Sequence, residues 1–154
     1  MDIVVRRKMM SNFAGFIRRT GLKYKCFFIR KEPDASEADI VASLRDVFEP
    51  FLSENFARLS AYSMIQVAYD KGQKLLSQLI TKTFQSRFPN VRLTKVLPIH
   101  SRIFQVADFV CTLKRMSYRL ETTGTLAKSE LKFFGTTANF QRNWLNPFAK
   151  HEWR

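Results

Sequence analysis

The stretch IFQVADFVCTLKR, Ile103–Arg115, predicts the helix around which we expect the rest of the chain to be organised. Most of its residues are apolar, so little of its surface is left for water. Its polar residues follow at spacings of four, three and four, which aligns them on one helix face that two arginines continue. These residues are Ser101, Gln105, Asp108, Thr112, Arg115 and Arg119. Aspartate has no intrinsic preference for a helix interior. Asp108 therefore either lies on a solvent face, the commoner case, or faces a cleft where it binds a metal.

The composition indicates one folded, basic domain over residues 1–154. Of the 154 residues, 45% are hydrophobic and 15 are Phe, which suits a single domain with a substantial core. The 26 Lys and Arg against 13 Asp and Glu give a net charge of +13. This surplus favours a polyanionic partner, nucleic acid first and an anionic membrane surface second. A basic protein without a dedicated partner would have the same charge.

Cysteine usage and the apolar segments indicate a cytoplasmic protein. Cys26 and Cys111 lie in apolar runs, which is typical of small buried side chains in a reducing compartment rather than of a disulfide. Without a CxxC motif, and with two histidines, no zinc site is expected. No segment has the length of a signal peptide's apolar region or of a membrane span. We therefore predict a cytoplasmic location and no membrane partner.

Hydrophobic periodicity predicts strands that alternate with helices. The expected order is a basic helix at 4–19, a strand at about 23–30, a helix after Ser36, a strand at about 62–69, a helix around 75–83, a strand at about 91–97 and a helix from about His100. Crossovers of this length lead to parallel strands covered by helices. The predicted fold is therefore an α/β core over residues 1–124 with three mainly parallel strands, followed by a short helical tail at 125–154.

Local signals predict where several of these helices begin and end. Ser36 followed by Asp39 is a capping-box arrangement, with Asp in place of the usual Glu. Gly135 is expected to end a helix in the C-terminal region. Pro50 should kink or divide the helix that follows Ser36, and Asn146–Pro147 should end the last helix.

Two aspartates stand alone in a basic part of the sequence. Between Asn55 and Leu120 the only acidic residues are Asp70 and Asp108, among eleven Lys and Arg. Asp70 follows a predicted strand at its carboxyl end, where open α/β sheets bind ligands. Carboxylates that hold Mg²⁺ or Mn²⁺, among basic residues that hold the polyanion, are what phosphodiester hydrolysis requires. The alternative is that Asp70 starts an ordinary Asp-Lys-Gly turn, and two acids are few for a two-metal site.

Basic residues would bind nucleic acid whether or not the chain cleaves it. The candidates are the basic helix Arg6–Arg19, whose polar side carries Arg6, Arg7, Lys8, Arg18 and Arg19, together with Lys71, Lys74, Lys114, Arg115 and Arg119. Aromatic residues near the end of the chain, Trp144, Phe148 and Trp153, either stack on bases or dock on the core. Glu130 is a third candidate acid, and is more simply a surface or capping residue.

Four segments resemble a family of ribonuclease H-like proteins of bacteria and phages, the domain-of-unknown-function family thirty-eight hundred. They are KYKCFFIRKE at 23–32, AYDKGQ at 68–73, RIFQVADFVCTL at 102–113 and LAKSELKFFG at 126–135. The resemblance implies a ribonuclease H-like fold. It also implies that Asp70 and Asp108 match two of the acids that ligate a divalent metal, Mg²⁺ or Mn²⁺, with no other cofactor.

Members of that family open with a strand that carries an Asp-Glu-Ser-Gly motif, which this sequence lacks. We therefore expect a C-terminal portion of the fold, weakly active or inactive as a nuclease by itself. The predicted strand Tyr24–Ile29 would then present an open sheet edge that invites a homodimer or a complementing chain. Three hypotheses follow: an incomplete metal-dependent nuclease using Asp70 and Asp108, a non-catalytic nucleic-acid-binding module, and a protein-interaction module.

Overall fold

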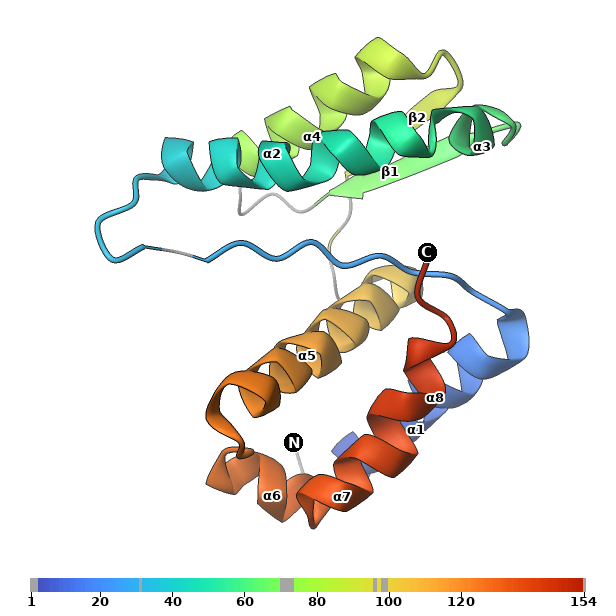
Figure 1. Ribbon diagram of the computed structural model, residues 1–154. Coiled ribbons are helices and arrows are strands. Elements are labelled where there is room, and N and C mark those ends of the chain that lie inside the picture. Colours follow the sequence, from blue (N-terminus) through green and yellow to red (C-terminus); the bar gives the residue numbers. More distant parts are fainter. Residues whose placement is uncertain (1–2, 31, 70–73, 96, 98–99, 154) are drawn as a thin grey trace. The chain divides into compact units, whose positions relative to one another are not determined.

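The computed structural model describes residues 3–30, 32–69, 74–95, 97 and 100–153. Its elements form two compact units, which are described one at a time (Figure 1). The helical unit contains Met1–Cys26 and Gln105–Arg154, and the α/β unit contains Phe27–Phe104. The α/β unit is thus inserted in the sequence of the helical unit. The predicted single domain stays a prediction.

The helical unit is built from two long helices and a C-terminal run of short ones (Figure 1). Its elements are α1 (Ile3–Thr20), α5 (Arg102–Thr123), α6 (Lys128–Phe134), α7 (Thr137–Phe140), the π-helical turn η2 (Gln141–Leu145) and α8 (Asn146–Ala149). One face of α5 is buried, and its residues are Val106, Phe109, Val110, Leu113, Met116 and Leu120. This face packs in one core with Ala14 and Ile17 of α1. The central stretch of the sequence therefore forms an amphipathic helix, rather than one buried on nearly all sides.

The C-terminal region is helical over Lys128–Ala149, as predicted, and these helices are part of the core rather than an appended tail. Leu126, Phe134, Phe140 and Phe148 are all buried in the same hydrophobic cluster as α5. The prediction that Asn146–Pro147 ends a helix was wrong, because Pro147 lies in the first turn of α8. α8 directly follows η2, so Pro147 lies within a continuous helical run and does not end it.

The α/β unit combines helices with one small sheet. Its elements are α2 (Glu37–Glu54), α3 (Phe56–Ser60), β1 (Ile65–Tyr69), α4 (Lys74–Arg87) and β2 (Val91–Lys95). The two strands pair in parallel, with Ile65 opposite Val91 and Tyr69 opposite Lys95. The parallel pair expected at 62–69 and 91–97 is therefore confirmed, in shorter strands.

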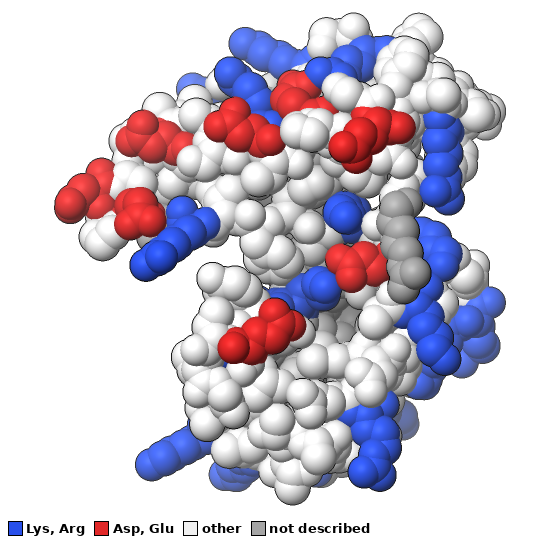
Figure 2. Space-filling view, in the orientation of Figure 1, with Lys and Arg blue, Asp and Glu red and all other residues white. Residues whose placement is uncertain are grey.

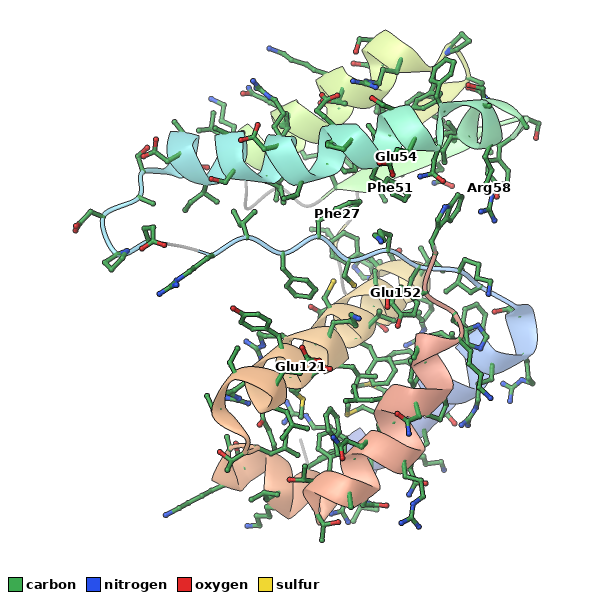
Figure 3. All side chains as sticks on the ribbon, in the orientation of Figure 1. Phe27, Phe51, Glu54, Arg58, Glu121 and Glu152 are labelled. Carbon is green, nitrogen blue, oxygen red and sulfur yellow. The ribbon has the colours of Figure 1, made fainter. Side chains whose placement is uncertain are left out.

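Aromatic contacts hold α2 to the neighbouring segments of the α/β unit. The Phe27 ring lies edge-on to Phe48 and Phe51 of α2, with centroids 5.1 and 5.3 Å apart (Figure 3). Phe48 also lies 5.7 Å from Phe84 of α4. The Arg87 side chain connects the same two helices, since it pairs with Glu49 and donates a hydrogen bond to Ser53. Offset and edge-on ring pairs of this kind add stability beyond the area they bury.

The predicted fold class was wrong, because the chain is mostly helical and has two short strands within its described residues. The stretch expected as a strand at 23–30 is extended, yet it joins neither β1 nor β2. Its backbone pairs at one point with the C-terminal segment: Tyr24 N–H donates to His151 O (3.0 Å) and Trp153 N–H donates to Tyr24 O (2.7 Å). A partial ribonuclease H-like sheet is therefore not formed, and the open sheet edge expected at Tyr24–Ile29 does not exist.

Most of the local capping signals are confirmed. Ser36 N–H donates to the Asp39 carboxylate (2.9 Å), and Asp39 N–H donates to Ser36 Oγ (3.2 Å), which completes the capping box of α2. Gly135 follows α6 with φ of +84°, a conformation that favours glycine. The predicted division at Pro50 was wrong, because α2 continues through this exposed residue to Glu54.

Candidate nucleic-acid interface

The structure gives Asp108 an open position on the helix surface. Its side chain is exposed on α5, on the face opposite the buried stripe, and it makes no hydrogen bond or ion pair with any described residue. Its predicted partner Asp70 lies outside the described residues, as does Lys71. The pairing of the two aspartates around Mg²⁺ or Mn²⁺ therefore stays a prediction. Within the described parts of the chain, no three His, Cys, Asp or Glu side chains are grouped to hold a metal ion.

Three of the predicted nucleic-acid-binding residues are engaged inside the helical unit. Lys114 of α5 pairs with Glu152 (3.0 Å), and Arg119 pairs with Glu130 of α6. The Arg7 guanidinium donates to the carbonyls of Lys132 and Phe133, each at 2.9 Å, at the C-terminal end of α6. It also lies 5.5 Å from the centroid of the Phe133 ring. These cations stabilise the packing of α6 and of the C-terminal segment, and two of them are already neutralised by carboxylates.

Glu130 has the capping role that its position suggested. One carboxylate oxygen accepts a hydrogen bond from Ala127 N–H (2.8 Å) at the start of α6, while the other meets Arg119. A carboxylate at a helix N-terminus is favourable because it satisfies a free N–H group and meets the positive end of the helix dipole. Glu130 is therefore a structural residue here.

Two of the three predicted stacking aromatics, Trp144 and Phe148, dock on the core. Phe148 is buried, and Trp144 lies edge-on to Phe134 and Phe109 at 5.3 and 6.4 Å between ring centroids. Both side chains therefore take part in the packing of the helical unit.

Among the predicted cations, Arg6, Lys74 and Arg115 remain exposed and without a partner among the described residues. Arg6 lies on α1 and Arg115 on α5, both in the helical unit, whereas Lys74 begins α4 of the α/β unit. The structure therefore does not bring the predicted set onto one surface within either unit.

The basic helix predicted over Arg6–Arg19 as a nucleic-acid contact is α1, and one face of it carries further exposed cations besides Arg6 and Arg7. Lys8, Arg18 and Arg19 are exposed on the side of α1 opposite the buried Ala14 and Ile17. None of the three makes a hydrogen bond or ion pair with the described part of the protein. Helical spacing in the sequence predicts this basic face, because positions 8, 15 and 19 fall on one side of the helix and positions 10, 14 and 17 on another.

Small residues separate the two ends of this basic face. Ser11, Asn12 and Gly15 lie between Lys8 and Arg19, and the helix carries no acidic residue from Ile3 to Thr20. The Arg19 guanidinium lies across Gly15, since a Cβ atom at that position would come within 3.1 Å of it. We refer to Lys8, Ser11, Asn12, Gly15, Arg18 and Arg19 as the α1 face.

The positive charge is concentrated in the helical unit. Its sequence contains 15 Lys and Arg against 5 Asp and Glu, a net charge of +10, whereas the α/β unit has 11 against 8, a net charge of +3. Figure 2 shows acidic side chains in a row along α2 of the α/β unit. In the same orientation, Figure 1 shows where the C-terminal half of α1 lies. At that place in Figure 2 the surface of the helical unit carries Lys and Arg side chains, in blue. The electrostatic attraction for a polyanion therefore belongs mainly to the helical unit.

A cavity of about 410 Å³ lies between α5 and the C-terminal helices of the same unit. Its floor is apolar and includes Leu113 and Phe148, and Lys114 lies at its wall. Figure 3 shows Glu121 on α5 and Glu152 in the C-terminal segment. Because Glu152 neutralises Lys114, the cavity has no free cation to attract an anionic ligand. It is therefore a weaker candidate for a polyanion site than the α1 face.

Comparison of the chain with models of protein families, with characterised proteins and with solved structures gives no significant match. The resemblance to the ribonuclease H-like family thus stays a prediction, and the fold that it implies is not the fold observed. No helix within the described residues is long and apolar enough to cross a membrane.

Proposed function

We propose that the protein is a non-catalytic nucleic-acid-binding module that contacts the sugar-phosphate backbone through the α1 face. The observation that supports this most directly is the set of Lys8, Arg18 and Arg19. All three are exposed on one acid-free helix face and none has a partner among the described residues.

The length of the α1 face suits several phosphate contacts. At a rise of about 1.5 Å per residue, Lys8 and Arg19 lie about 16 Å apart along the helix axis. A DNA duplex carries about one negative charge per 1.7 Å, so several phosphates lie within that span. The Ser11 hydroxyl and the Asn12 amide between the cations are groups that donate hydrogen bonds to phosphate oxygens. Backbone contacts of this kind carry no base information, so we expect binding with little sequence preference.

The salt dependence of binding tests this proposal. Fluorescence anisotropy with a labelled DNA duplex and a labelled single-stranded RNA would compare wild type with the triple variant Lys8→Gln, Arg18→Gln and Arg19→Gln. Each lost phosphate contact lowers the slope of log affinity against log salt by about 0.9 on the duplex and about 0.7 on the single strand. The triple variant should therefore lose about 2.7 units of slope on the DNA and about 2.1 on the RNA, and should bind both more weakly at every salt concentration.

A matched variant separates the loss of contacts at the α1 face from the effect of lowering the protein's net charge by three. Lys82→Gln, Arg92→Gln and Lys95→Gln together remove three exposed cations of the α/β unit. This control should retain most of the affinity and slope. Equal losses in the two triple variants would refute the α1 face as the contact surface, and unchanged binding in the first would refute it as well.

The nuclease hypothesis has its own test in the same samples. It requires Mn²⁺ to raise the melting temperature and Asp108→Asn to abolish that rise, because the carboxylate would be a metal ligand. Binding through the α1 face requires neither result. We infer that the protein acts in the cytoplasm, where a nucleic-acid partner and reduced thiols occur together.

A further inference from the structure

The two cysteines of the chain lie side by side in the helical unit. Cys26 and Cys111 are 85 positions apart in sequence, and their Sγ atoms are 3.8 Å apart. Both are free thiols, Cys26 half-buried and Cys111 exposed. The expectation of two buried small hydrophobes was therefore wrong for Cys111, which solvent reaches directly.

Rigid elements hold both sulfur atoms in place. Cys111 lies in the middle of α5, and Cys26 comes two residues after Tyr24, whose backbone is bonded to the C-terminal segment by His151 O (3.0 Å) and Trp153 N–H (2.7 Å). A disulfide has an S–S distance of about 2.05 Å, so the two sulfurs need to approach by about 1.8 Å. Rotation of the cysteine side chains about the Cα–Cβ bond supplies movements of that size.

We propose that Cys26 and Cys111 form a reversible oxidation site, at which a peroxide converts the neighbouring thiols into an intramolecular disulfide. The Cys111 thiolate attacks one peroxide oxygen, the O–O bond breaks, and hydroxide leaves, so that Cys111 becomes a sulfenic acid. The Cys26 sulfur then attacks the Cys111 sulfur, the S–O bond breaks, and water leaves with the Cys26 proton. Two thiols and one hydrogen peroxide thus give one disulfide and two waters, with two electrons passing to the peroxide.

The surroundings of the pair favour this order of attack. Hydrogen bonding from the Cys26 thiol lowers the pKa of Cys111 to about 7, although burial and the Asp108 carboxylate oppose the shift. The same hydrogen bond, followed by burial, raises the pKa of Cys26. The nearby Lys114 ammonium lowers the pKa of Cys26, whereas the Glu152 carboxylate raises it. Cys111, exposed and partly ionised at neutral pH, is therefore the attacking thiol, and Cys26 is the resolving thiol.

The disulfide would link the segment through which the chain enters the α/β unit to the helix that follows it. Cys26 is the last residue before that unit, and Cys111 follows its end by a few residues on α5. Oxidation would therefore close residues 27–110, which include the whole α/β unit, into a covalent loop and prevent the segment at Cys26 from separating from α5. Cross-linking a loop of this length constrains the unfolded chain strongly.

Mass spectrometry of the full chain tests the proposal. Reduced protein treated with a small excess of hydrogen peroxide should lose two hydrogens, about 2 Da, while remaining a monomer. Its two alkylatable thiols should fall to none, and a reductant should restore both. Tryptic mapping should recover one peptide pair that links Cys26 to Cys111. Retention of both thiols, or a disulfide between two chains as the sole product, would overturn the proposal.

Single substitutions separate the roles of the two thiols. Cys26→Ser should leave a Cys111 sulfenic acid that dimedone traps, because no resolving thiol remains. Cys26 in Cys111→Ser should react with peroxide more slowly than Cys111 does in Cys26→Ser, because burial disfavours the Cys26 thiolate. The pH midpoint of Cys111 alkylation should rise from near 7 toward the ordinary thiol value of about 8.5 in Cys26→Ala, because alanine removes the hydrogen-bond donor. Equal reactivity of the two thiols, or an unchanged midpoint, would contradict the assigned order.

Discussion

Replacement of Glu130 gives a sharp test of how the helical unit is held together. This residue caps α6 through Ala127 N–H and pairs with Arg119 of α5, so it joins two helices with one carboxylate. The Glu130 side chain is 16% exposed and the Arg119 side chain 42% exposed. The Arg119 Nε atom is buried without a hydrogen-bond partner among the described residues, so the pairing with Glu130 compensates part of that desolvation.

The expected magnitude follows from the two contacts of the carboxylate. Loss of a helix cap costs about 1 kcal/mol. Ion pairs at the surface contribute about 0.2–1 kcal/mol, and a pair with one partner this well covered lies near the upper end of that range. Because Arg119 retains exposed surface, water can solvate its charge and the larger cost of a stranded buried ion does not apply. Glu130→Ala should therefore lower the free energy of unfolding by about 2 kcal/mol.

Glu130→Gln separates the two contributions, because its amide oxygen still accepts from Ala127 N–H. It should cost about half as much as Glu130→Ala. Urea unfolding followed by tryptophan fluorescence reports on the helical unit, since Trp144 and Trp153 both belong to it. A loss below about 0.5 kcal/mol in Glu130→Ala, or equal losses in the two variants, would refute the assigned structural role.

Two further substitutions test the packing and the electrostatics of the same unit. Leu113 is 2% exposed, so Leu113→Ala leaves a cavity in the core and should lower the free energy of unfolding in urea by about 3–5 kcal/mol. Tyr118 is 59% exposed, so Tyr118→Ala should change that free energy by less than about 0.5 kcal/mol. Burial and, next, the Glu152 carboxylate raise the pKa of Tyr24 to about 12, from 10 in the unfolded chain. The neutral phenol is thus favoured in the folded state, so its stabilising contribution is complete below pH 10 and is lost between pH 10 and 12. The stability difference between wild type and Tyr24→Phe should shrink over that interval, and a phenolate titration of Tyr24 centred at 10 would contradict this.

Local features of the fold could be predicted because they depend on neighbouring residues. The Ser36 capping box, the glycine that ends α6 and the amphipathic helix at 4–19 all follow from contacts within a few positions of the chain. The parallel strand pair was also predicted, because a strand, a helix and a second strand follow each other closely. The stretch at 23–30 has the composition of a strand, yet composition does not specify a partner.

For the candidate interface, too, the sequence predicts the local features and leaves the long-range contacts undetermined. The excess of basic residues and its location on α1 are visible in the sequence, because charge and helical period are local properties. The sequence does not show which of these cations form hydrogen bonds or ion pairs within the folded protein. Arg7, Lys114 and Arg119 bind groups more than ten positions away, and only the packing of α6 and of the C-terminal segment brings those groups near.

By itself, the sequence determined the long helices, the capping box at Ser36, the glycine after α6, the strand pair and the sign of the charge. Tertiary structure decided that residues 125–154 complete the core, that Tyr24 pairs with the C-terminal segment, and that Cys26 meets Cys111. The physical reason is that the first group depends on the backbone's own periodicity and on near neighbours. The second depends on which of many apolar and hydrogen-bonding surfaces meet when the chain collapses, and contacts between distant residues leave no local pattern in the sequence.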